Sequence, residues 1–404
     1  MVRGGFHLIR FVRDNEKQQS QEKRSRVLPF LLPCCSSRVT NIVSQAAHSS
    51  RVDKQKHPKK CEPKPHKKVK ATPTVIAMFL PSSLLQIATG VLVGVAALGL
   101  CVVSVASSKW KNDTNRDVQA LMKDIETHAT EAKKKVPHWN DLPSPVVRYL
   151  QSALILDHND SVSIPMIQSL SMTQSGTFLL NGQWIPFTAK QVFSAVCPGF
   201  VWDAHMHIPL PLALGSCGIR VRDAYVAGRG TMVAKIWGFL PMVHQHDTPM
   251  LNEGELSRWF GECMVMPTAF LGLSNTTGHN HNQECVLQWK NEATTPTSAT
   301  AVLVDFRTNS NTTVQTEITF TMDEATGLVK SISALRPYCP PGGSQDVAML
   351  LPWQGNFLEY QNRGGILVPI RMEVGWWKQN AEGKQFLELY FRGHNHSFDF
   401  DFTE

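Results

Sequence analysis

The chain has 404 residues and a formal net charge of +7, but that charge is unevenly distributed. Residues 1–73 carry 17 Lys and Arg against 5 Asp and Glu, which leaves 23 basic and 28 acidic residues for the rest. The basic end has few aromatic residues and stops where an apolar stretch begins, so it favours contact with anionic lipid headgroups. This distribution argues against a nucleic-acid-binding protein.

Residues 1–73 have the composition of a disordered basic tail. Arg51–Lys70 combines lysine, proline and histidine with almost no side chains that a folded core can bury. Met1–Arg13 alternates apolar residues with arginine, as some targeting peptides do, but acidic residues follow at once. A targeting peptide is therefore the less favoured alternative.

Residues 74–107 contain no charged side chain and are predicted to form a transmembrane segment. Leu84–Ala106 supplies 23 mostly apolar residues, enough for one helix to cross a bilayer. A cleaved signal peptide is the alternative, but this apolar run is longer than a signal peptide needs. Gly90 and Gly94 form a small-xxx-small pair, which predicts a possible homodimer through the transmembrane helix.

The residues that flank this segment predict its orientation in the membrane. Lysine and arginine are concentrated on the N-terminal side, so the positive-inside rule places the tail in the cytosol and residues 110–404 outside or in a lumen. All five N-x-[ST] triplets lie on the C-terminal side, which agrees with a glycoprotein domain there. They begin at Asn112, Asn159, Asn275, Asn311 and Asn395.

The segment after the span begins with helical patterns. Residues 111–136 have apolar side chains at helical spacing and are predicted to form an amphipathic connecting helix. Leu142–Leu150 reads as a short capped helix. A further helix is expected over Asn252–Met264, starting at a capping box formed by Asn252 and Glu255.

Most of residues 163–402 shows the two-residue period of β-strands. The Gly-rich stretch Ala227–Gly230 predicts a hairpin. Further strands are expected near 284–290, 299–306, 314–321, 327–334, 356–361, 365–375, 385–392 and 396–402. So many sequential strands predict an α+β domain with a strongly curved antiparallel sheet, half-barrel or barrel-like, with a few packed helices. Such a sheet often encloses an apolar cavity.

A set of segments resembles an uncharacterised domain family, known mainly from bacterial membrane-anchored proteins and of unknown function. The resemblance covers nearly all of residues 136–404, and it implies no activity. The segments are LPSPVVRYL (142–150), WIPFTAKQ (184–191), PGFVWDA (198–204), VRDAYVAGRGTMVAKIWG (221–238), GELSRWFGE (254–262) and GILVPIRMEVGW (365–376).

Carboxylates and one arginine are the candidate catalytic groups. Glu255, Arg258 and Glu262 lie along one face of the expected helix, and Asp223 lies in a strand. A carboxyl beside a cavity can act as a general acid or base if burial raises its pKa. The favoured interpretation is structural: an ion-pair network around Arg258 that docks the helix on the sheet, and that Arg148 and Arg222 can join.

Histidine pairs are the candidate metal ligands. His205 with His207, and His394 with His396, have the i, i+2 spacing that points two side chains to one face of a strand. No carboxylate or cysteine stands at ligand spacing beside them, so no metal and no cofactor is predicted.

Aromatic residues are the candidate ligand-binding groups. Such side chains either fill a β-sheet core or line a lipid pocket. The candidates are Trp184, Phe187, Trp202, Tyr225 and Trp237.

Three functions follow from this reading. The favoured one is a membrane-anchored protein that binds a lipid or another apolar ligand at the membrane surface. The second is a hydrolase or isomerase that acts on a membrane-derived substrate through Glu255, Glu262 or Asp223. The third is a structural or interaction protein. No Gly-x-Ser-x-Gly, P-loop or His-Glu-x-x-His motif occurs, which favours binding over catalysis.

Overall fold

The computed structural model describes residues 82–134, 142–155, 166–209, 216–273, 284–307, 313–338, 349–380 and 382–402. The predicted basic tail (1–73), its targeting peptide and the approach to the span (74–81) lie outside these residues. So do three of the predicted glycosylation triplets, which begin at Asn159, Asn275 and Asn311.

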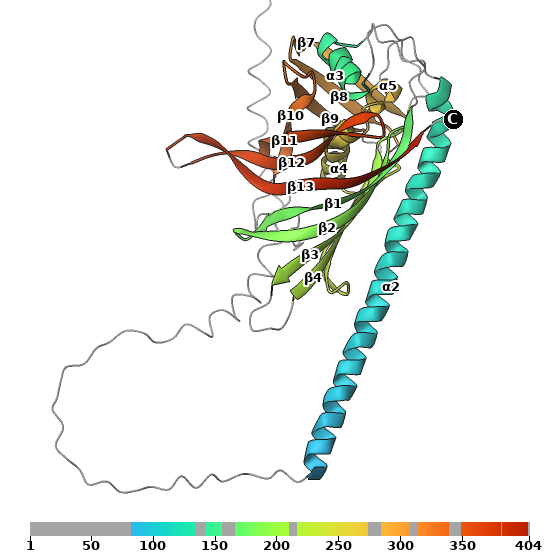
Figure 1. Cartoon of the computed structure of the whole chain (residues 1–404), viewed down its shortest axis with the longest axis vertical. Coiled ribbons are helices and arrows are strands. Elements are labelled where there is room, and N and C mark those ends of the chain that lie inside the picture. Colours follow the sequence, from blue (N-terminus) through green and yellow to red (C-terminus); the bar gives the residue numbers. More distant parts are fainter. Residues whose placement is uncertain are drawn as a thin grey trace, which may run out of the picture.

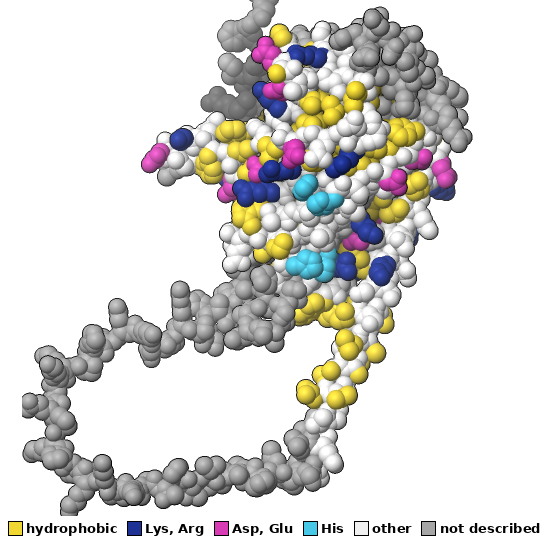
Figure 2. Space-filling model, viewed as in Figure 1, with side chains coloured by type: hydrophobic (Ala, Val, Ile, Leu, Met, Phe, Trp, Pro, Cys, Tyr) yellow, Lys and Arg dark blue, Asp and Glu magenta, His cyan; other side chains and the backbone are white. Residues whose placement is uncertain are grey.

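One long α-helix, α2 (Ser82–Lys134), contains both the predicted span and the predicted connecting helix. Its 53 residues extend about 80 Å at 1.5 Å per residue. Two separate elements were expected, but no proline or glycine lies between Ser107 and Lys134 to interrupt the helix. The part that begins at Thr89 is long and apolar enough to cross a membrane. It projects beyond the β-sheet with exposed hydrophobic side chains (Figures 1 and 2).

The described strands form a 13-stranded antiparallel sheet in the order β6-β5-β4-β3-β2-β1-β13-β12-β11-β10-β9-β8-β7. Two meanders, β1–β6 and β7–β13, are therefore joined where β1 pairs with β13. The strands are β1 (Ile167–Leu180), β2 (Gln183–Ser194), β3 (Gly199–Pro209), β4 (Ser216–Val226), β5 (Arg229–Ile236), β6 (Leu240–His246), β7 (Cys285–Thr295), β8 (Ser298–Asp305), β9 (Val314–Met322), β10 (Val329–Tyr338), β11 (Met349–Arg363), β12 (Ile366–Gln379) and β13 (Gln385–Phe402).

The sheet curls into a half-barrel, as its number of strands predicted (Figure 1). From β6, at one edge, the chain reaches β7, at the other edge, through three helical elements. These are α4 (Pro249–Glu262), the short 3-10 helix η2 (Cys263–Val265) and α5 (Ala269–Leu273). Helix α4 contacts β3, β4 and β5 of the first meander and β9 and β10 of the second, so it bridges the hollow of the sheet.

Helix α2 packs on the opposite face of β2, β3 and β4 from α4. Leu121 and Ile125 of α2 are buried there in a small apolar cluster with Val196, Val201 and Ala224. The main core lies on the inner face, where Trp202, Trp259, Phe260 and Phe320 are almost fully buried. The sheet therefore separates an inner core from a docked helix.

Two expected boundaries are wrong. Helix α4 begins after Thr248, whose side chain caps it by accepting a hydrogen bond from the Leu251 N–H at 3.3 Å, and not at Asn252. The Asn252 side chain instead accepts from the Gly230 N–H at 2.7 Å. The strands expected at 385–392 and 396–402 are one strand, β13.

Of two further expected features, the hairpin between β4 and β5 has the expected turn, whereas the expected cap of α3 is not formed by a side chain. The Gly-rich hairpin is confirmed, because Ala227 and Gly228 join β4 to β5 with φ of 48° and 78°, as a type I′ turn requires. Helix α3 (Ser144–Ala153) has the expected prolines at its start but no side-chain cap.

The glycosylation triplet at Asn395 is excluded in the folded domain. Its side chain is fully buried and donates to the Pro369 carbonyl at 3.1 Å. It also accepts from the Gln174 amide at 2.9 Å. Asn112 is exposed on α2, six residues after Ala106, so of the two described triplets only that one is accessible.

Candidate functional site

A cavity of about 410 Å³ lies between α4 and the inner face of the sheet. Its wall is formed by β1, β3, β4, β5 and β10–β13, so both meanders contribute to it. Four alternate residues of β12 line it because every second side chain of a strand points to the same face, and Glu373 contributes as well. The four are Met372, Val374, Trp376 and Lys378. The volume is in the range of ligand pockets, roughly 300–1,000 Å³.

Aromatic rings form a large part of this wall. Phe178 contacts Phe391 at 5.1 Å and Trp202 at 6.3 Å between ring centroids. Trp376 stacks on Tyr390, whose hydroxyl accepts a hydrogen bond from the Trp353 indole at 3.0 Å. These contacts fix the rings, so the cavity has a preformed apolar surface.

Arg258 of α4 joins the helix to the sheet at the polar side of the cavity. Its guanidinium contacts Asp223 of β4 at 2.8 Å and Glu262, one turn further on α4, at 2.9 Å. It also lies over the rings of Phe200 and Trp202, at 4.8 and 4.9 Å from their centroids. The predicted network around Arg258 thus exists, and it faces the cavity.

Two carboxyls in this group have raised pKa values. Burial raises the pKa of Asp223 to about 6, although the Arg258 guanidinium lowers it. Burial also raises the pKa of Glu255 well above its usual value, and the negative charge of Asp223 adds to that effect. Burial therefore favours the protonated form of Glu255, and Asp223 changes charge in the mildly acidic range.

Arg336 of β10 brings a positive charge to the cavity wall. Its Nη2 donates to the Gly254 carbonyl of α4 at 2.7 Å, and its guanidinium lies 4.7 Å above the Trp353 ring centroid. Within the described chain no carboxylate forms an ion pair with it. Arg336 can therefore bind an anionic or hydrogen-bond-accepting group of a ligand.

The four predicted catalytic candidates, Asp223, Glu255, Arg258 and Glu262, all line this cavity. The two arginines expected to join them do not. Arg148 donates instead to the Glu324 carbonyl. Arg222 follows the alternation of β4 to the other face and pairs with Asp117 of α2 at 2.8 Å.

Of the five aromatic candidates, only Trp202 lines the cavity. Phe187 is buried behind it, 5.7 Å from Trp202 between centroids. The Tyr225 hydroxyl donates to buried Asp305 at 2.9 Å. Trp184 lies 4.4 Å under the Arg392 guanidinium, and Trp237 is exposed in the β5–β6 turn.

Sequence reasoning missed most of the aromatic wall. Phe178, Trp353, Trp376, Tyr390 and Phe391 come from β1 and β11–β13. The alternation of these strands was recognised, but alternation does not tell which face of a strand is the inner one. The adjacent tryptophans at 376 and 377 were the available signal, since one of them had to face inward.

The histidine pairs do not converge. The rings within each pair are close, with centroids 4.1 Å apart for His205 and His207 and 4.5 Å for His394 and His396. His205 is aligned with Thr188, Ser175 and then His394 across β3, β2, β1 and β13. Three strand spacings of about 4.8 Å keep the pairs some 14 Å apart.

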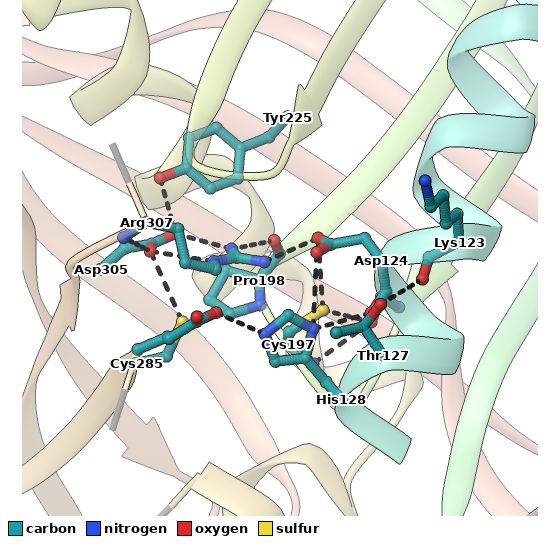
Figure 3. A network of polar contacts seen from close by, with 12 residues as sticks. Lys123, Asp124, Thr127, His128, Cys197, Pro198, Tyr225, Cys285, Asp305 and Arg307 are labelled. Atoms are coloured by element: carbon teal, nitrogen blue, oxygen red, sulfur yellow. Dashed lines mark hydrogen bonds and ion pairs between the residues drawn. The ribbon is translucent and has the colours of Figure 1, made fainter. Parts of the chain in front are cut away.

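A second polar cluster fastens α2 to the sheet (Figure 3). The Arg307 side chain is 4% exposed and contacts Asp124 of α2 at 2.7 Å and Asp305 at 2.6 Å. Its Nη2 also donates to the Pro198 carbonyl at 2.6 Å. One arginine thus joins the helix, the β2–β3 turn and the end of β8.

His128 extends this cluster on α2. Its Nε2 lies 2.8 Å from Glu284 Oε2, and Nδ1 lies 2.7 Å from the Asp124 carbonyl oxygen. The hydrogen bond with the Cys197 side chain raises the pKa of His128 to about 10, more than burial lowers it. His128 is therefore positively charged at neutral pH and adds to the attraction between helix and sheet.

Asp124, His128 and Cys197 are close enough to hold one metal ion, but they do not fit one. A carbonyl oxygen only accepts, so Nδ1 carries the hydrogen and offers the metal no lone pair. The Arg307 guanidinium already occupies the Asp124 carboxylate. The cluster is better suited to docking than to metal binding.

Fold and cavity together define a class: a curled antiparallel sheet with an internal, mostly apolar cavity, fixed to a helix long enough to cross a membrane. The chain belongs to the family of unknown function DUF6920, which it matches over residues 140–400. This confirms the expected membership of an uncharacterised domain family. No curated protein is a detectable relative of the chain.

Solved structures show distant similarity. A putative outer membrane lipoprotein-sorting protein domain from Vibrio parahaemolyticus aligns at 10% identity and a TM-score of 0.29, over 69% of this chain and 93% of that one. A DUF1329 family protein from Desulfovibrio piger aligns at 10% identity and a TM-score of 0.28, over 64% and 90%.

Proposed function

We propose that this protein is a membrane-anchored binding protein that holds a lipid or another apolar ligand in the cavity between α4 and the sheet. The observation that carries the proposal is the aromatic cavity with Arg336 in its wall. Apolar side chains supply a dry surface for a hydrocarbon group, and the arginine supplies a partner for a polar headgroup. The ligand that fits this chemistry is an amphipathic lipid.

The anchor is the N-terminal part of α2. The helix enters the domain without a break and is fastened there by Arg222, Arg307 and the apolar cluster around Leu121. The domain is therefore held close to the bilayer that the span crosses. On the charge distribution, the tail is cytosolic and the domain extracytosolic or lumenal. A homodimer through Gly90 and Gly94 stays a prediction; neither glycine has a neighbouring atom within 4 Å of its Cβ position.

Native mass spectrometry of the full chain, released from detergent micelles, tests the binding function. We expect one retained lipid per wild-type chain. Val374→Trp places a large ring inside the cavity and should abolish that retention. Leu358→Trp makes a comparable change at a half-exposed position of β11 that does not line the cavity and should leave retention unchanged.

Equal retention in the two variants, with wild-type melting temperatures, would contradict lipid binding in this cavity. Lipid that binds only to the span would be retained by both Val374→Trp and Leu358→Trp, so the comparison distinguishes it from lipid in the cavity.

A second function is favoured by one observation. Asp223, with a pKa of about 6, and Glu255, whose pKa burial raises well above its usual value, face the same cavity, as a base and an acid do in many hydrolases and isomerases. We propose this activity as the alternative. It predicts that the wild-type chain converts a bound membrane-derived lipid and that Asp223→Asn binds it without converting it. Recovery of the same unaltered lipid from both proteins would exclude it.

A further inference from the structure

The turn between β5 and β6 exposes three large hydrophobic side chains. Trp237, Phe239 and Leu240 are 44%, 38% and 44% exposed. The Trp237 and Phe239 rings stack with centroids 6.1 Å apart. Trp237 has a φ of +49°, a conformation that asparagine and glycine adopt more easily. A tryptophan therefore occupies a backbone conformation that is strained for it, at an exposed position.

This turn lies against the end of the membrane span. A Cβ atom on Gly238 would be 3.9 Å from the Ala106 backbone and side chain. Ala106 is the last residue of the predicted span, and Val102 and Val105, just before it, are 43% and 69% exposed. Figure 2 shows hydrophobic side chains on the free part of α2 and on the adjoining edge of the domain. The exposed turn and the exposed span are thus continuous.

Cationic side chains accompany this surface. Lys109 and Lys111 are exposed on α2 just after the span. Lys235, at the end of β5, lies with its Nζ 5.8 Å from the Trp110 ring centroid. Aromatic residues next to lysines at the end of a membrane helix are typical of the interface between hydrocarbon and headgroups.

We infer that the Trp237–Leu240 turn inserts into the headgroup region of the bilayer that holds the span. The inference rests on the proposed anchoring by α2. The inserted turn is a second point of attachment to the bilayer, and it fixes both the rotation of the domain about α2 and the height of the domain above the bilayer. Apolar side chains of interfacial helices reach about 5–10 Å into the boundary between headgroups and acyl chains, and those of this turn should reach a similar depth.

The small size of the surface favours a bilayer over a protein partner. A large aromatic side chain has an accessible surface of about 150–250 Å². With the exposed fractions given above, the three side chains together expose roughly 250 Å². A stable protein interface needs about 800 Å² on each side. A second copy of the chain would therefore gain little from this turn, whereas the bilayer is already beside it.

Lipid photocrosslinking in the full chain tests the inference. The chain is reconstituted in phosphatidylcholine–phosphatidylglycerol vesicles with a benzophenone amino acid in place of Phe239. The matched control replaces Phe306, which is 51% exposed. Phe306 lies far from the predicted span. It adjoins Arg307, which contacts Asp124 of α2. Asp124 is 18 residues beyond Ala106, which corresponds to about 27 Å along the helix axis. A third variant carries the probe at Leu98, in the span.

We expect a lipid adduct at Phe239 with a yield several-fold above that at Phe306 and close to that at Leu98. Adding Trp237→Asn should lower the yield at Phe239 several-fold, and the domain should still fold because asparagine suits the positive φ. Equal yields at Phe239 and Phe306, with a strong adduct at Leu98, would overturn the inference and leave the anchor intact. No adduct at Leu98 would overturn the anchor, and the inference with it.

Discussion

Arg222 and Asp223 are consecutive residues of β4 that bind two different helices on opposite faces of the sheet. Arg222 pairs with Asp117 of α2 on the outer face, and Asp223 pairs with Arg258 of α4 on the inner face. Both distances are 2.8 Å, and both residues of β4 are buried. One strand therefore connects α2 to the cavity wall, so a shift of β4 would affect both the docking of α2 and the cavity.

The first prediction concerns the pH dependence given by Asp223. Its pKa is raised from 3.8 to about 6 in the folded chain, so the folded state binds more protons than the unfolded state between these values. Stability from this group is complete below about pH 4 and is lost as the pH rises to about 6. Asp223→Asn should remove this pH-dependent contribution to the stability of the fold.

The measurement is the melting temperature of the full chain in detergent, followed by tryptophan fluorescence across this pH range. Between pH 4 and 6.5 the wild-type curve should fall relative to the Asp223→Asn curve. Asp401→Asn, an exposed change on β13, is the control and should run parallel to wild type. Parallel curves for all three proteins would show that Asp223 titrates normally.

The second prediction concerns His128 on α2. Its pKa is raised from 6.5 to about 10, so its charged form stabilises the docked helix. That stability is complete below about pH 6.5 and is lost as the pH rises toward 10. His128→Gln should be less stable than wild type near pH 6.5, and the two should converge at high pH. His244→Gln, at an exposed position of β6, serves as the control. A constant difference at all pH values would argue against a charged His128.

The sequence predicted local features well and long-range relationships poorly. Helical spacing placed Arg258 and Glu262 on one face, and the structure pairs them one turn apart. Arg222 was expected in the same network as Asp223, but the two neighbours in β4 point to opposite faces of the sheet, and local alternation does not say which of them faces a cavity. That depends on the curl of the whole sheet, to which strands more than 200 residues apart, such as β1 and β13, contribute.

The pairing of β1 with β13 shows the same limit. Gly176 is aligned with Gly393, and no pattern near either residue indicates the other. The continuity of α2 was missed for a different reason. The change from apolar to amphipathic residues after Ala106 marks the point from which α2 packs on the sheet, and not the end of a helix.

The third prediction concerns the close approach of β1 and β13 at Gly176. A Cβ atom there would lie 2.0 Å from the Arg392 carbonyl oxygen and 2.8 Å from a ring carbon of Phe187. The backbone would have to move, so Gly176→Ala should destabilise the chain by about 1–3 kcal/mol or more. At roughly 2–4 °C per kcal/mol, the melting temperature should fall clearly.

Gly254→Ala on α4 is the matched control. Its Cβ would lie 3.6 Å from the nearest atom, Arg336 Nη2, an ordinary contact. Replacing glycine inside a helix by alanine stabilises by up to about 1 kcal/mol. The two substitutions should therefore change the melting temperature in opposite directions. A neutral Gly176→Ala would mean that β1 and β13 are farther apart in solution.

The fourth prediction concerns the selectivity of the cavity for anionic ligands. Arg336 donates to a neutral acceptor, the Gly254 carbonyl, and although it attracts the nearby Glu253 and Glu255, no carboxylate of the described chain is in ion-pair contact with it. A hydrogen bond from a charged group contributes roughly 1.5–3 kcal/mol, or about tenfold or more in affinity. Arg336→Gln should lower the preference for phosphatidylglycerol over phosphatidylcholine by about that factor. Competition between the two lipids, followed by native mass spectrometry, measures it.

Lys330→Gln is the control for this prediction, because Lys330 is an exposed cation on the same strand. It removes one positive charge from β10 without changing the cavity and should leave the preference unchanged. A general electrostatic effect of the domain would lower the preference equally in both variants. Binding through Arg336 would lower it only in Arg336→Gln, because only that side chain lies in the cavity wall.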